Sequence, residues 1–169
     1  MSFLTCRVKF PHMKKTIEDF LNHKKIAIAG ASPRKDNFGR SLMNELGKLG
    51  NTIYPVNPKY QEIEGRSCVN SVRDLPGDVE NLILAVPPEL SEEIVNQAID
   101  SGIKRVWMIK GVGKGAYSKT AHRICEENQI QVIYGFCPMM FYGAGGHRFH
   151  FWLRKTFGKL PEEYLVSSN

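Results

Sequence analysis

The segment from Gly30 to Arg40 carries the side chains best suited to bind a phosphate group. It follows directly after the apolar run of residues 25–29. Gly30 permits a sharp turn and a close approach of the backbone to a ligand. The Ser32 hydroxyl can donate to a phosphate oxygen, and Arg34 and Arg40 can bind phosphate through two hydrogen bonds each. The segment matches neither the GxGxxG fingerprint nor the P-loop motif. By itself it therefore indicates a phosphate-containing ligand of unspecified type, with a helix-entry turn and solvated arginines as the alternative.

A second group of candidate ligand contacts, Val56, Asn57, Pro58 and Lys59, follows the apolar run of residues 51–56. An NAD-binding domain would carry an acidic residue here, because a carboxylate holds the ribose hydroxyls. This chain has Asn57 and Lys59 instead. Lys59 can pair with the 2′-phosphate of NADP or the 3′-phosphate of coenzyme A (CoA). The position argues against NAD and leaves NADP or CoA, and an ordinary turn lysine is the alternative.

Three further strand ends contribute candidate residues. The third apolar run leads into Val86, Pro87 and Pro88, which would form a rigid apolar rim along a ligand or simply start a helix. The fourth leads into Lys110 and a Gly-rich loop, either a lid over the ligand or a surface turn. The fifth leads into Cys137. The sequence shows no residue that would act as a general base for this thiol, so we expect it to be buried and not to act as a nucleophile.

These residues would be positioned by alternating strands and helices. Short, nearly continuous apolar runs predict strands buried on both faces of a parallel sheet, at residues 25–29, 51–56, 81–86, 105–109 and 131–134. Amphipathic segments with glycine stops predict helices between them, at residues 38–49, 88–101 and 115–128, with a leading helix at 14–22. We therefore predict an α/β fold, a three-layer Rossmann-like, doubly wound parallel sheet of five strands in the order 3-2-1-4-5. The ligand crevice is then expected outside strands 1 and 4.

The composition limits the class of protein. The chain has 169 residues, a net charge of +6 and 42% hydrophobic residues, which suits one globular domain. No apolar run approaches the length of a membrane span, and no signal peptide is recognisable. The four cysteines form no CxxC pair that would indicate a zinc or redox site. We expect a cytoplasmic protein with no metal and no membrane span.

The predicted domain is flanked by two other segments. We assign residues 1–13 to a leader, residues 14–138 to the Rossmann-like domain, and residues 139–169 to a Gly-rich linker with a basic, aromatic C-terminal helix. This helix could support a homodimer, and nucleic-acid binding is the less favoured use of its basic residues. His147 and His150 have no evident third metal ligand near them in the sequence, so a metal site is not expected there.

The ordered set of Gly-Ala-Ser-Pro, Pro-Val-Asn-Pro, Gly-Arg, Val-Pro-Pro and Cys-Pro resembles the CoA-binding protein family over about residues 24–138. It is similar to the CoA-binding domain of succinyl-CoA synthetase α-subunits and of ADP-forming acyl-CoA synthetases. The resemblance implies three sets of contacts: to the CoA phosphates from Gly30, Ala31, Ser32 and Arg34, to the adenosine side from Val56, Asn57, Pro58 and Lys59, and along the ligand from Val86, Pro87 and Pro88. Gly39, Arg40 and Lys110 complete the predicted cofactor-binding set.

The resemblance also bears on activity. The synthetases carry an active-site histidine and an ATP-grasp partner in other domains, for which this chain is too short. We therefore expect a stand-alone module that binds CoA or an acyl-CoA without a complete catalytic machine, in a carrier or regulatory role. An NADP-linked oxidoreductase, a nucleotide-sensing protein, and a nucleic-acid- or partner-binding protein are the alternatives.

Overall fold

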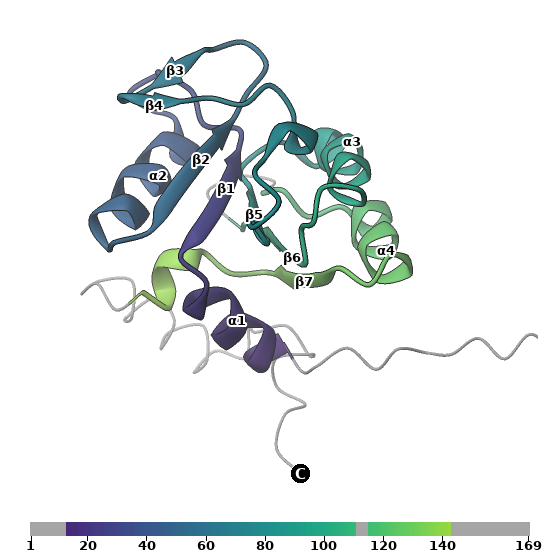
Figure 1. Ribbon diagram of the computed structural model, residues 1–169. Coiled ribbons are helices and arrows are strands. Elements are labelled where there is room, and N and C mark those ends of the chain that lie inside the picture. The colour runs from purple at the N-terminus through teal and green to yellow at the C-terminus, as the bar shows by residue number, and fades with distance from the viewer. Residues whose placement is uncertain (1–12, 111–114, 143–169) are drawn as a thin grey trace, which may run out of the picture.

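The computed structural model describes residues 13–110 and 115–142 of the chain (Figure 1). Its helices are α1 (Met13–Asn22), α2 (Phe38–Lys48), α3 (Pro88–Ala98) and α4 (Lys119–Glu127), with short 3-10 turns η1 (Val72–Asp74) and η2 (Pro138–Met140). The strands are β1 (Lys25–Ala29), β2 (Thr52–Val56), β3 (Glu62–Ile63), β4 (Arg66–Ser67), β5 (Asn81–Leu84), β6 (Arg105–Met108) and β7 (Gln131–Tyr134).

Five of the strands form one parallel sheet in the order β2-β1-β5-β6-β7. The chain crosses from β1 to β2 on one side and then to β5, β6 and β7 on the other side of β1. Because the crossovers are right-handed, α2 covers one face of the sheet, and the neighbouring helices α3 and α4 cover the other (Figure 1). The leading helix α1 packs against the sheet through Phe20, whose ring meets Trp107 of β6 edge-on at 5.1 Å between centroids. The predicted three-layer Rossmann-like fold is confirmed.

The predicted strand order 3-2-1-4-5 is wrong, because the third strand of the βα series, β5, pairs with β1 and not with β2. The series therefore runs 2-1-3-4-5, and β2 lies at the edge. Pro55 explains this position. Its carbonyl accepts a hydrogen bond from the Val69 N–H (3.0 Å) on the side away from β1, so its missing N–H also faces the edge. The order of strands changes at β1 and β5, so the ligand crevice is expected between these two strands.

A small antiparallel hairpin of β3 and β4 follows β2 and was not predicted. Each strand has only two residues, too few for a periodic pattern, and the turn contains Glu64 and Gly65 with φ angles of 53° and 73°. Arg40 of α2 forms an ion pair with Glu64, and Arg66 donates to Asn44 (3.2 Å). The hairpin is thus tied to α2, while the chain after it returns to the edge of β2.

Several predicted features lie wholly or partly outside the described residues. They are the leader, the loop at 111–114, and nearly all of the C-terminal segment with its linker, helix, histidines and proposed dimer contact. Helix α1 begins at Met13, one residue before the predicted domain start, and the Met13 side chain is buried. None of the helices in residues 13–110 and 115–142 has the length and apolar character of a membrane span.

Candidate functional site

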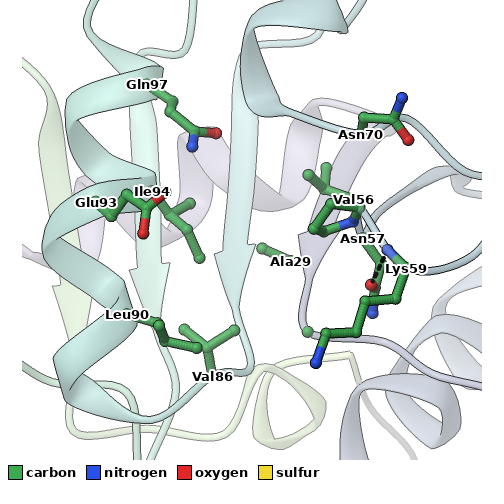
Figure 2. A pocket seen from close by; sticks show the side chains of 12 residues that line it. Ala29, Val56, Asn57, Lys59, Asn70, Val86, Leu90, Glu93, Ile94 and Gln97 are labelled. Carbon is green, nitrogen blue, oxygen red and sulfur yellow. Dashed lines mark hydrogen bonds between the residues drawn. The ribbon is translucent and has the colours of Figure 1, made fainter.

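A cleft of about 260 Å³ opens at the carboxyl ends of β1, β2 and β5 (Figure 2). It includes the point between β1 and β5 at which the strand order changes. Ala29 and Gly30 lie at its base. One wall comes from the chain that leaves β2, and the opposite wall comes from α3. This is the place at which open α/β sheets bind their ligands.

The wall that follows β2 contains Val56, Asn57, Pro58 and Lys59, all of them predicted site residues. The Asn57 amide donates to the Ala31 carbonyl (2.7 Å) and accepts from the Lys59 backbone N–H (2.9 Å). Asn57 therefore ties the loop after β1 to the loop after β2. The Lys59 side chain is exposed, and within the described part of the chain no carboxylate pairs with it. Lys59 thus offers a free positive charge at the cleft.

The α3 wall was largely missed by sequence reasoning. It presents Leu90, Glu93, Ile94 and Gln97, spaced at i, i+3, i+4 and i+7 and therefore on one face of the helix. Leu90 is 48% exposed and presents apolar surface to the cleft. The helical spacing could have identified this face, but not what it lines.

Glycine is required at two positions in the loop after β1. Gly30 has a φ of +97°, and a Cβ atom there would lie 2.3 Å from the Ala85 carbonyl oxygen. At Gly39 a Cβ atom would lie 2.9 Å from the backbone nitrogen of Ala31. The first glycine permits the turn at the base of the cleft, and the second lets α2 pack directly onto the loop.

Asn37, which had not been selected from the sequence, organises the same loop. Its side-chain oxygen accepts hydrogen bonds from the backbone N–H groups of Ser32 (3.0 Å) and Arg40 (2.7 Å), and its amide donates to the Gly30 carbonyl (3.1 Å). Asparagine is a preferred residue at the N-cap of a helix, and this preference could have indicated its role. Two N–H groups that an anion could use are therefore already bonded within the protein.

The two predicted phosphate-binding arginines also have internal partners. Arg34 forms a two-point contact with Asp36 (Nη2–Oδ2 2.8 Å) between side chains that are 73% and 71% exposed. The Arg34 hydrogen bond is the main reason why the pKa of Asp36 is lowered. Arg40 donates through Nε to Glu64 (2.7 Å). Neither arginine lines the cleft.

The cleft thus brings together six of the predicted residues: Gly30, Val56, Asn57, Pro58, Lys59 and Val86. The others are placed around it. Ala31 is buried beneath the loop, Pro87 and Pro88 form the N-cap and first residue of α3, and Lys110 is exposed after β6. At Cys137, burial raises the pKa of the thiol, which disfavours a thiolate nucleophile.

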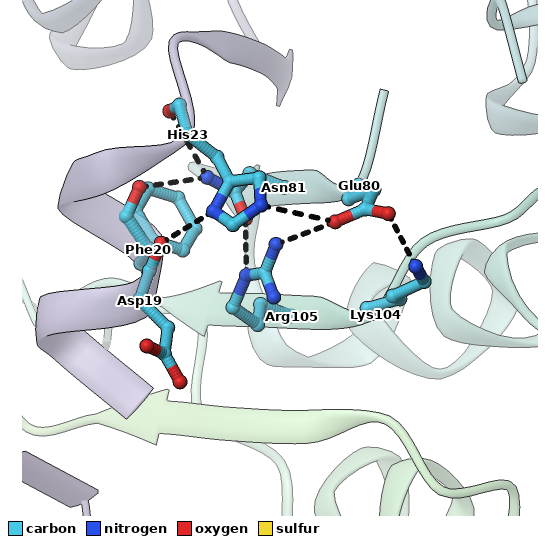
Figure 3. Close-up of polar contacts among 7 residues, drawn as sticks. All are labelled: Asp19, Phe20, His23, Glu80, Asn81, Lys104 and Arg105. Atoms are coloured by element: carbon cyan, nitrogen blue, oxygen red, sulfur yellow. Dashed lines mark hydrogen bonds and ion pairs between the residues drawn. The ribbon is translucent and has the colours of Figure 1, made fainter. Parts of the chain in front are cut away.

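A separate polar cluster lies at the opposite, amino-terminal end of the sheet (Figure 3). Glu80 forms ion pairs with Lys104 and with Arg105 (2.8 Å), and His23 Nε2 lies 3.4 Å from the same carboxylate. Arg105 also donates to Asn81 (2.7 Å), whose amide donates to the Phe20 carbonyl at the end of α1 (2.8 Å). The hydrogen bond from Lys104 foremost, and that from Arg105, lower the pKa of Glu80. The cluster joins α1 to β5 and β6. Across residues 13–110 and 115–142, no group of His, Cys, Asp and Glu has a metal-binding arrangement.

Known proteins share this domain. The model of the CoA binding domain matches residues 24–143. An ADP-forming acetate–CoA ligase of Methanocaldococcus jannaschii is 29% identical over 141 residues, which are 81% of this chain and 19% of the ligase. The alpha subunit of ADP-forming acetate–CoA ligase II of Pyrococcus furiosus is 30% identical over 118 residues, 69% of this chain and 25% of the subunit.

A solved structure agrees with the sequence relatives. A hypothetical protein from Pyrococcus horikoshii OT3 superposes with a TM-score of 0.69 at 35% identity, covering 80% of this chain and 92% of that one. This chain spans a quarter or less of the two ligase polypeptides. In contrast, the match to the P. horikoshii protein covers nearly the whole length of that protein. Because the domain model covers most of the sequence, the chain belongs to the CoA-binding domain family.

Proposed function

We propose that this chain binds CoA or an acyl-CoA in the cleft between β2 and α3, and that it acts through binding and not as a ligase. The observation that carries the proposal is Lys59, a cation without a carboxylate partner in the described residues, opposite the apolar side chains Leu90 and Ile94 of α3. CoA combines a 3′-phosphate with a flat base and an apolar arm. A site for it therefore needs both a positive charge and an apolar wall.

The size of the cleft fits one part of such a ligand. Its volume of about 260 Å³ is slightly below the range for small-molecule sites, so the remainder of CoA would extend over the surface. Val86, Leu90 and Ile94 would contact the base, and Lys59 would pair with the 3′-phosphate. Bound CoA would supply a thiol that carries an acyl group, while the residues of this chain hold and orient the ligand.

The loop after β1 would hold the pyrophosphate. Gly30, Ala31 and Ser32 form the turn beside the cleft, and helix α2 begins directly after it. The Arg34–Asp36 ion pair is exposed, and exposed ion pairs contribute little free energy, so a phosphate could displace Asp36. Arg40 is less available, because its pair with Glu64 is largely covered.

Calorimetric titration with CoA, dephospho-CoA, NADP and NAD tests the proposal. We expect CoA to bind about tenfold more tightly than dephospho-CoA, as for one charge-assisted contact, and NAD to bind most weakly. Lys59→Ala should abolish the preference for CoA over dephospho-CoA. The matched control Lys48→Ala removes an exposed lysine that is paired with Glu45 on α2, and it should change nothing.

Two results would contradict the proposal. If none of the four ligands bound measurably, a nucleotide site of this type would be ruled out. Tighter binding of NADP than of CoA would favour an NADP-linked oxidoreductase instead, because Lys59 could equally accept a 2′-phosphate.

A further inference from the structure

The side chain of Gln97 is oriented by η1. The Val72 backbone N–H (3.3 Å) and the Ser71 hydroxyl (2.8 Å) both donate to its Oε1. Because a backbone N–H can only donate, these contacts identify the oxygen and leave the Nε2 group on the other side of the amide. No described residue accepts a hydrogen bond from this Nε2. Gln97 therefore brings an unused donor to the cleft that it lines.

Glu93 lies one helical turn before Gln97 and lines the same wall (Figure 2). In the part of the chain that the structure describes, no cation pairs with its carboxylate. A carboxylate is unexpected in a cleft that faces a ligand with several phosphates, because like charges repel. Glu93 is exposed, and its carboxylate can accept a hydrogen bond from an uncharged donor of a ligand in the cleft.

The surfaces between these polar groups are apolar. Val86, Leu90 and Ile94 line the cleft beside Glu93, and Val56 lies on the opposite wall (Figure 2). A flat, uncharged ring could be covered by these side chains while its edge meets Glu93 and Gln97. The wall thus offers one acceptor and one donor, adjacent at i and i+4 on α3.

We propose that Glu93 and Gln97 read the Watson–Crick edge of an adenine base. The N6 amino group of adenine would donate to the Glu93 carboxylate, and the Gln97 Nε2 would donate to N1. This inference rests on the proposed function and names how the site selects the base of its ligand. Recognition of a base by hydrogen bonds to this edge, with apolar contacts to its faces, is a general mode of nucleobase binding.

Hypoxanthine reverses both groups, because it presents an acceptor at O6 and a donor at N1. The wild-type chain should therefore bind CoA at least about tenfold more tightly than its hypoxanthine counterpart, since a mismatched polar group in such a site stays unpaired. If Glu93 instead held a ribose hydroxyl, the two ligands would bind equally, because they differ only in the base.

The test is a calorimetric titration of both ligands against the full chain and its variants. Glu93→Gln places a donor opposite O6, and Gln97→Glu places an acceptor opposite N1 while it still accepts from Ser71 and Val72. The double variant E93Q/Q97E should reverse the preference, so that the hypoxanthine ligand binds more tightly than CoA. Glu45→Gln, a matched change on α2, should keep the wild-type preference. Thermal unfolding of each variant verifies that it is folded.

The outcomes separate this inference from the proposed function. Equal wild-type affinity for the two ligands overturns the reading of the base and leaves CoA binding intact. A folded double variant that still prefers CoA overturns it as well. Absence of binding by either ligand to the wild-type chain overturns both proposals.

Discussion

The two ends of the sheet differ in how their polar groups are paired. At the amino-terminal end, Glu80, Asn81 and Arg105 bond to one another and to α1 (Figure 3). At the carboxyl-terminal end, Lys59 and Glu93 have no ion-pair partner among the described residues (Figure 2). Polar groups in a folded chain are normally satisfied by the protein or by water. The amino-terminal cluster thus joins elements of the fold, and we propose that the groups at the carboxyl-terminal end meet a ligand.

The loop after β1 shows that lying at the carboxyl end of the sheet does not by itself leave a polar group without a partner in the protein. It lies at the carboxyl end of the sheet, yet Asn37 holds the N–H groups of Ser32 and Arg40, and Arg34 is paired with Asp36. Residue types that suit a phosphate can be used within the protein. A phosphate that binds at this loop would therefore have to displace Asp36 from Arg34.

Among variants at the two ends of the sheet, Gly30→Ala at the base of the cleft should cause the largest loss of stability. A methyl group would lie 2.3 Å from the Ala85 carbonyl oxygen at a φ of +97°, so the two strand ends would have to separate. We expect the free energy of unfolding to fall by about 4 kcal/mol. Urea denaturation measures this. The control Gly65→Ala, with a φ of +73° but open space around it, should cost only about 1 kcal/mol. Equal losses would contradict a packing role for Gly30.

At the amino-terminal end, Arg105→Ala should lower the free energy of unfolding by about 3 kcal/mol, because it removes the buried partner that Glu80 and Asn81 share. The Arg105 side chain is only 8% exposed. Lys104→Ala removes another positively charged partner of the Glu80 carboxylate. Because the Lys104 side chain is 64% exposed, we expect the free energy of unfolding to fall by less than about 1 kcal/mol. Urea denaturation compares the two variants. Similar losses would show that the buried contact has no special weight.

The smallest effect concerns pH. The pKa of Glu80 is lowered in the folded chain from its ordinary value of 4.5, chiefly by the Lys104 hydrogen bond. The folded state therefore favours the ionised form, and the resulting stability is present above the ordinary pKa and is lost as the pH falls through the lowered one. Glu80→Gln should thus be less stable than the wild type near neutral pH, with a difference that shrinks in acid. Denaturation across this range checks the trend, and a constant difference would contradict it.

Much of the fold follows from the sequence by itself. Apolar runs and glycine stops located the strands and helices that form the layers, because these patterns are local and repeat within a few residues. The same pattern placed Gly30, Val56, Asn57, Pro58, Lys59 and Val86 at the ends of strands, where the structure brings them to one cleft. The motifs around them also indicated the CoA-binding domain family, which the domain match confirms. Pro55 could have placed β2 at the edge of the sheet.

Only the tertiary structure decided which polar groups have partners. Gln97 meets Ser71, and Asn57 meets Ala31, each across 26 residues of sequence, and Arg40 meets Glu64 on a hairpin that has no periodic signal. The cleft wall of α3 faces β2 because β5 inserts beside β1, a pairing between segments more than 50 residues apart. Such contacts depend on how the elements assemble and not on local pattern. For that reason the sequence located the ends of the strands, whereas only the structure shows that Lys59, Glu93 and Gln97 line one cleft.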